Sequence, residues 1–115
     1  MSLKVYGIPN CDTVKRARAW LGEHGVEFTF HDFKKAGVPA ELDQWIDALG
    51  WEALVNRKGT TWRKLSEAER AAVLDAASAR AALRAAPSLI KRPVVDWGQG
   101  EITVGFSPEA WSRRL

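Results

Sequence analysis

Two short apolar segments near the N-terminus predict strands, and a segment with helical periodicity lies between them. Residues 3–8 form an apolar run that ends in a proline and an asparagine, which is typical of a buried strand and a turn. Residues 11–24 carry apolar side chains at helical spacing, and Gly25 ends the helix. These positions are Val14, Ala17 and Leu21. Residues 26–31 alternate apolar and polar positions, as a strand does. Together these segments predict a βαβ unit with parallel strands.

The middle of the chain predicts helices and no strands. One helix should begin near Pro39 and end before Gly50, because apolar positions again follow helical spacing. These positions are Leu42, Trp45, Ile46 and Leu49. Ser66 and Glu69 form a capping-box pattern that opens an alanine-rich segment. Composition alone leaves open whether residues 66–86 form one helix or two.

The C-terminal part of the chain predicts a hairpin and a short helix. Residues 94–97 and 102–106 read as antiparallel strands joined by a four-residue loop at 98–101. Ser107 is suited to cap a last helix, with Pro108 at its first position.

The predicted element order is β-α-β, several helices, then β-β-α. This order is the layout of a thioredoxin-like α/β domain with a mixed four-stranded sheet. A helical insertion would occupy about residues 39–86. At 115 residues the chain is long enough for one domain, so we predict a single domain over residues 1–115.

Composition narrows the class of protein. Apolar residues make 46% and charged residues 27% of the chain, values close to those of globular proteins. No apolar run approaches the ~20 residues that span a membrane, and the first residues lack the apolar core of a signal peptide. We therefore expect a soluble, cytoplasmic, monomeric protein with no membrane partner. With one cysteine and two histidines, neither an internal disulfide nor a structural zinc site is expected.

Charge favours small anionic ligands over nucleic acid. The net charge is +3, and 17 Lys and Arg residues are interleaved with 14 Asp and Glu residues. The densest basic cluster, residues 15–18, comes shortly after Cys11. Because no RNA-binding signature accompanies these charges, we expect no nucleic-acid partner.

The single cysteine is the main candidate for chemistry. Cys11 falls where the first strand gives way to the first helix. Unpaired N–H groups and the helix dipole stabilise a thiolate at such a position, and the thiolate is the nucleophilic form. Lys15, one turn later, should lower the thiol pKa further, whereas Asp12 should oppose it. Composition alone favours a packing role for a lone cysteine. The position of Cys11 in a turn before a helix makes a catalytic role equally plausible.

A phosphatase-type loop is excluded by spacing. Such loops need Cys, five residues, then an arginine that clamps phosphate with two hydrogen bonds. The sixth residue after Cys11 is Ala17, and Arg16 and Arg18 lie on either side of it.

Three motifs, spread over the chain in order, carry a family resemblance. They are residues 7–15 (GIPNCDTVK), 56–65 (NRKGTTWRKL) and 90–95 (IKRPVV). They resemble the arsenate-reductase-like ArsC/Spx family, and most of all its small YffB-type branch. The resemblance implies a thioredoxin-like fold with a helical insertion and a reactive thiol at Cys11. It also implies that Arg92 faces this thiol and precedes a cis proline, Pro93.

The resemblance implies a glutathione-dependent thiol reductase. The Cys11 thiolate would attack an oxidised or anionic small substrate and form a covalent adduct. With no second cysteine in the chain, an external thiol must resolve the adduct, and glutathione is the abundant cytosolic thiol. Glutaredoxin is a further expected partner, and no metal is expected. The residues expected to bind glutathione or the substrate are Asn10, Lys15, Arg57, Lys58, Arg92 and Pro93.

Two departures from the family pattern qualify this function. Arsenate reductases of the family hold the oxyanion with three arginines, of which Arg92 matches one. The second position falls at Asn56, next to Arg57, and the third near Gly105. Losing a charged donor costs about 1.5–3 kcal/mol, so arsenate reduction should be weak or absent.

The second departure concerns the alternative function. The Spx-type relatives are regulators that bind RNA polymerase and switch through a C-x-x-C pair. Val14 stands at the second cysteine position, so no internal disulfide switch can form. A non-enzymatic regulator that binds RNA polymerase or another protein remains the alternative.

Overall fold

The computed structural model describes residues 3–115. Met1 and Ser2 lie outside the described residues. They belong to the first residues of the chain, for which no signal-peptide pattern was found. The chain divides into two compact units. The first combines the described part of Met1–Phe33 with Arg92–Leu115, and the second is Lys34–Lys91, which contains the predicted insertion. That both units fold as one domain stays a prediction. Within residues 3–115, no helix has the length and hydrophobicity needed to cross a membrane.

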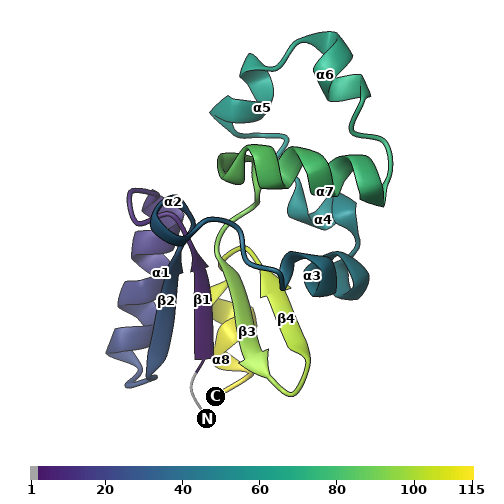
Figure 1. Ribbon diagram of the computed structural model, residues 1–115. Coiled ribbons are helices and arrows are strands. Elements are labelled where there is room, and N and C mark those ends of the chain that lie inside the picture. Colours follow the sequence, from purple (N-terminus) through teal and green to yellow (C-terminus); the bar gives the residue numbers. More distant parts are fainter. Residues whose placement is uncertain (1–2) are drawn as a thin grey trace. The chain divides into compact units, whose positions relative to one another are not determined.

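A four-stranded mixed sheet forms the centre of the first unit (Figure 1). Its strands are β1 (Leu3–Gly7), β2 (Phe28–Asp32), β3 (Val94–Gly98) and β4 (Glu101–Val104). They lie in the order β2-β1-β3-β4, with β1 parallel to β2 and antiparallel to β3. Strand β3 is also antiparallel to β4. This arrangement confirms the predicted α/β, thioredoxin-like fold and its parallel first pair.

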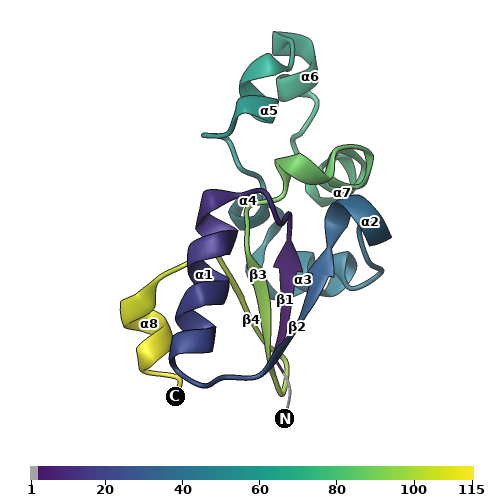
Figure 2. The ribbon, with the colours of Figure 1, turned by 90° about the vertical axis from the view of Figure 1, so that its left-hand side faces the viewer.

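Two helices cover one face of this sheet. Helix α1 (Asp12–Glu23) and helix α8 (Pro108–Ser112) lie on the same side of the strands (Figure 2). The buried core between them and the sheet consists of Val5, Ala17, Leu21, Val95 and Trp111. The Trp111 ring packs edge-on against three aromatic rings, with centroids 4.8–5.7 Å away. These rings belong to Trp20, Trp97 and Phe106. The predicted helical spacing of Val14, Ala17 and Leu21 is confirmed, since all three are buried.

The hairpin between β3 and β4 corrects the predicted loop. Gly98 pairs with Glu101, so the loop contains two residues, Gln99 and Gly100, and not the four predicted at 98–101. Gln99 has φ 57° and Gly100 has φ 79°. Positive φ at both central residues defines the tight turn whose twist matches that of the flanking strands. Strand β4 also ends at Val104, two residues before the predicted end.

The second unit consists mainly of short helices. They are α3 (Leu42–Leu49), α4 (Trp51–Leu54), α5 (Thr60–Lys64), α6 (Glu67–Ala71) and α7 (Ala76–Ala85), followed by a 3-10 turn at Pro87–Leu89. Helix α2 (Phe33–Ala36) begins at the boundary between the units. The helix predicted to begin near Pro39 starts at Leu42, because residues 39–41 form a turn in which Pro39 O accepts the Leu42 N–H. The helices α3, α4 and α7 pack against one another.

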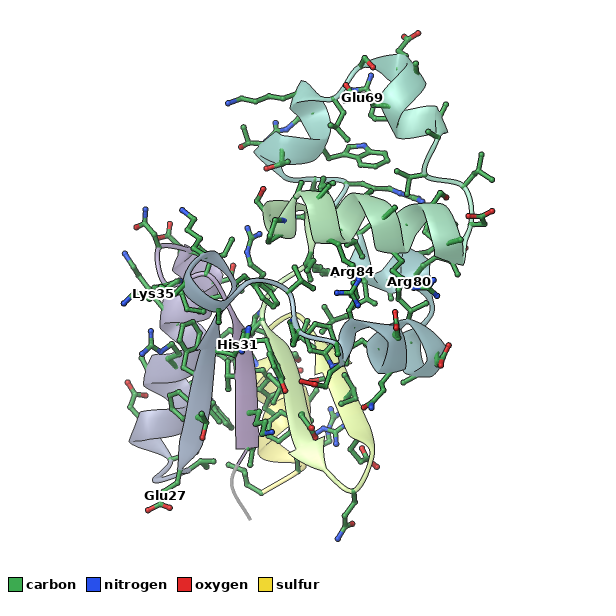
Figure 3. All side chains as sticks on the ribbon, in the orientation of Figure 1. Glu27, His31, Lys35, Glu69, Arg80 and Arg84 are labelled. Carbon is green, nitrogen blue, oxygen red and sulfur yellow. The ribbon has the colours of Figure 1, made fainter. Side chains whose placement is uncertain are left out.

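The alanine-rich segment 66–86 forms two helices, a choice between one helix and two that composition left open. Ser66 caps α6, as predicted, through a reciprocal pair of hydrogen bonds with Glu69. The chain then leaves helical geometry before Asp75, which caps α7 through a similar pair with Ser78. An exposed ion pair between Arg80 and Asp43, 2.8 Å apart, joins α7 to α3, and Arg84 lies beside it (Figure 3).

Candidate active site around Cys11

The turn between β1 and α1 places Cys11 at the start of the helix. Its N–H donates to the Ile8 carbonyl (3.2 Å), and its own carbonyl accepts the Lys15 N–H (2.9 Å). Cys11 is the N-cap residue of α1 and has the extended backbone usual at that position, with φ −107° and ψ 126°. Its side chain is half-buried. The predicted position of Cys11 at the helix N-terminus is confirmed.

The surroundings of the thiol favour its ionised form. Burial raises the pKa of Cys11, but three groups together outweigh this effect. They are the Val14 N–H, the Arg92 guanidinium and the Thr13 N–H. The pKa of Cys11 therefore lies below its ordinary value of 9.0. A lower pKa increases the fraction of thiolate at neutral pH, and the thiolate is the reactive form.

Arg92 reaches Cys11 from the segment that leads into β3. It interacts with the thiol both through a side-chain hydrogen bond and through its charge. The Arg92–Pro93 peptide bond is cis, as the family resemblance implied. Pro93 is buried, and its carbonyl accepts the Gly105 N–H (2.9 Å), which ties the start of β3 to the end of β4. Arg92 and Cys11 are thus brought together although 80 residues separate them in the chain.

The other predicted residues near the thiol lie on the surface. Asn10 and Lys15 are exposed, and their role in binding a ligand of the thiol stays a prediction. Lys15 and Asp12 are not among the groups that shift the Cys11 pKa, so the charge effects expected of them are not seen. The helix amides and Arg92 act in their place.

Arg57 and Lys58 belong to the second unit. The Asn56 side-chain oxygen accepts the Lys58 N–H (3.2 Å) and shapes this loop. The Arg57 guanidinium lies 5.7 Å from the ring centroid of Trp51 and 5.8 Å from that of Trp62, within the range of cation–π attraction. This contact with Trp51 was not predicted, because side chains on two separate helices supply the rings. The roles of Arg57 and Lys58 in ligand binding stay predictions.

Thr13 and Val14 lower the pKa of the thiol through their backbone N–H groups; the sequence predicted such helix amides but did not assign this role to these two residues. They occupy the second and third helical positions, whose N–H groups face the N-cap side chain in any helix. Their side-chain identities carry no such signal. Within residues 3–115, no group of three His, Cys, Asp or Glu side chains is placed to hold a metal ion.

Comparison with known proteins gives the relationships of the chain. The model of the ArsC family matches residues 6–113. An uncharacterized protein of Haemophilus influenzae is 40% identical over 110 residues, which are 95% of each chain. The global transcriptional regulator Spx of Streptococcus pyogenes is 27% identical, over 88% of this chain and 75% of that protein.

Solved structures of similar fold point to the same family. The structure of a YffB protein is 47% identical, covers 97% of each chain and has a TM-score of 0.90. An arsenate reductase (ArsC) related protein from Brucella melitensis is 51% identical, with a TM-score of 0.78 over 98% of this chain and 93% of that one. The match of the family model over nearly the whole chain, together with a thioredoxin-like sheet that presents Cys11 beside Arg92, shows that the chain belongs to the ArsC family.

Proposed function

We propose that this protein is a glutathione-dependent thiol reductase with Cys11 as its nucleophile. The observation that carries the proposal is the lowered pKa of Cys11, caused by helix amides and the Arg92 guanidinium against the opposing effect of burial. A packing cysteine has no need of such donors, and burial in apolar surroundings would raise its pKa. Because glutathione is kept reduced in the cytosol, the proposal places the protein in the cytoplasm.

The reaction can be written for a substrate thiol, RSH, that is bound to glutathione as a mixed disulfide, RS–SG. The Cys11 thiolate attacks the glutathione sulfur, so that a Cys11–SG bond forms and the RS–SG bond breaks. The leaving RS⁻ takes a proton. A second glutathione, as its thiolate, attacks the glutathione sulfur of the adduct, which releases GSSG and restores the Cys11 thiolate. The substrate gains two electrons and one free glutathione is consumed for each turnover.

Charges near the thiol support glutathione as the second substrate. Glutathione carries two carboxylates, and Arg92 and the exposed Lys15 supply positive charge in the same unit as Cys11. Asn10 and Pro93 lie next to Cys11 and Arg92 in the chain and are proposed to contact the peptide part of glutathione. Arg57 and Lys58 are proposed as further anion-binding residues.

The test measures both half-reactions. The reduced protein is incubated with GSSG, and mass spectrometry should show one glutathione on Cys11, which free glutathione then removes. With a mixed disulfide of glutathione and 2-mercaptoethanol as substrate, GSSG should form faster than in the protein-free reaction. Cys11→Ser is the control and should show neither step. GSSG formation no faster than without protein would overturn the proposal. Turnover with dithiothreitol but not with glutathione would overturn the glutathione dependence.

Arsenate is proposed to be a poor substrate. The chain has no arginine between Arg92 and Arg113, so the closing hairpin offers no third arginine to hold the oxyanion. With glutathione and glutaredoxin supplied, arsenate-dependent oxidation of glutathione should be weak or absent. Turnover near the ~10 s⁻¹ typical of enzymes would show this part of the proposal to be wrong.

The relationship to Spx supports a regulator as the second candidate. The similarity covers 88% of this chain, although Val14 replaces the second cysteine of the Spx-type switch. A pull-down with the tagged protein that recovers RNA polymerase subunits, combined with no glutathione chemistry at Cys11, would favour this function. Glutathione turnover without any recovered polymerase would exclude it.

A further inference from the structure

Gly7, the last residue of β1, lies unusually close to the first turn of α1. A Cβ added to Gly7 would lie 2.9 Å from Cγ2 of Val14 and 3.5 Å from its Cγ1. It would also lie 3.8 Å from Cε1 of Phe30. Carbon atoms pack favourably at about 3.5–4.0 Å, so only the contact with Cγ2 is a clash.

Val14 cannot relieve this clash by rotating. It is fully buried at the base of α1, and a valine in a helix has one strongly preferred rotamer because its Cβ is branched. A side chain at position 7 would therefore displace the backbone at the start of α1. The conformation of Gly7 itself needs no glycine, because its φ is not among the positive values found in residues 3–115. The absent Cβ is thus a matter of space and not of backbone freedom.

The backbone that would be displaced is the one that faces the thiol. The N–H groups of Val14 and Thr13 belong to this first turn. The Cys11 N–H, by contrast, is anchored to the Ile8 carbonyl at the end of β1 (3.2 Å). A shift of the helix away from β1 would therefore separate the amides from the sulfur, and hydrogen bonds weaken steeply as their distance and angle depart from the optimum.

We propose that Gly7 is a positioning residue for the reactive thiol: because it has no Cβ, the first turn of α1 packs against β1 and its amides stay close to the Cys11 sulfur. The inference rests on the proposed function for its biological meaning, since it concerns the same thiol. Its geometry is independent of which thiol or substrate reacts.

The test compares the Cys11 pKa in the wild type and four variants, measured as the pH dependence of the rate of alkylation by iodoacetamide. Gly7→Ala should raise the pKa by roughly half a unit to one unit, within the range by which neighbouring groups shift pKa values. The double variant Gly7→Ala/Val14→Ala removes both Cγ atoms, keeps the backbone N–H and should return the pKa towards that of Val14→Ala alone. Gly22→Ala is the matched control, because Gly22 lies in α1 with nothing within 4 Å of an added Cβ. It should leave the pKa unchanged.

The outcomes separate the two proposals. An unchanged pKa in folded Gly7→Ala, or a raised pKa that removal of the Val14 side chain does not correct, would overturn the positioning role. If Gly7→Ala does not fold, a folded double variant whose Cys11 pKa equals that of Val14→Ala supports the positioning role of Gly7. If neither Gly7→Ala nor the double variant folds, the positioning role is overturned. The pKa is measured without any substrate. Wild-type protein that lacks glutathione turnover therefore refutes the proposed function alone.

Discussion

The start of α1 differs from the starts of α6 and α7 in how the first amides are used. At α6 and α7 the cap side chain accepts an N–H and the third helical residue returns a hydrogen bond, through Ser66 with Glu69 and Asp75 with Ser78. At α1 the cap is Cys11, and its side chain makes no cap hydrogen bond of ordinary geometry. The amides of its first turn instead lower the pKa of the thiol.

The same physics serves two purposes at these helix starts. Bonding to Ser66 lowers the pKa of Glu69, and bonding to Ser78 lowers the pKa of Asp75, so each cap favours a carboxylate that is already charged at neutral pH. At Cys11 the favoured anion is a thiolate, which is a nucleophile. The starts of α6 and α7 thus serve stability, whereas the start of α1 gives up part of that stability for reactivity.

The largest expected effect comes from converting the start of α1 into an ordinary cap. Cys11→Ser should abolish glutathione transfer, because a hydroxyl is a far weaker nucleophile than a thiolate. The free energy of unfolding should stay the same or rise by up to about 1 kcal/mol, because serine is a preferred N-cap residue. Urea unfolding and the mixed-disulfide assay measure both quantities. A variant that loses several degrees of melting temperature would instead mark Cys11 as a packing residue.

The second prediction separates Arg92 from the helix amides. Arg92→Ala should raise the pKa of Cys11, and alkylation near neutral pH should slow several-fold, since each pKa unit changes the thiolate fraction about tenfold. Arg92→Lys should restore part of the shift through its charge but not the geometry of the guanidinium. Arg16→Ala, at an exposed position on α1, is the control and should leave the pKa unchanged. Equal Cys11 pKa values in wild type and Arg92→Ala would mean that the helix amides alone lower this pKa.

The third prediction concerns a cap without a catalytic role. Ser66→Ala should lower the free energy of unfolding by about 0.5–2 kcal/mol, because the Glu69 N–H loses the hydroxyl that accepts its hydrogen bond. Alkylation of Cys11 should be unaffected at every pH, which would confirm that the two kinds of helix start act separately. An altered Cys11 pKa in this variant would contradict that separation.

The smallest effect is a pH dependence of stability. The Cys11 pKa is lowered in the folded protein, so the unfolded state holds its proton to higher pH. The wild type should therefore gain stability relative to Cys11→Ser as pH rises from the folded pKa to the unfolded one. The gain is complete above the unfolded pKa and absent below the folded one. Denaturant unfolding at several pH values measures the difference, and a difference that falls with rising pH would mean that the pKa is raised.

Local signals along the chain were enough to predict most elements and the position of the reactive residue. Each of these depends on a few neighbouring residues: the apolar spacing of α1, the Ser66 and Ser107 caps and the turn that places Cys11 at a helix start. The cap at Asp75 is also a local signal, and its pattern with Ser78 separates α6 from α7. The alanine-rich composition around it hid this boundary.

Tertiary structure decided what depends on distant partners. The hairpin loop shortened to two residues because the pairing of Gly98 with Glu101 is set by the register of β3 and β4. The approach of Arg92 to Cys11 follows from the place of β3 beside β1, which no local pattern encodes. The close contact of Gly7 with Val14 likewise exists only once β1 and α1 pack together. Local preferences place a residue on an element, whereas the pKa of its side chain depends on which elements the fold brings against it.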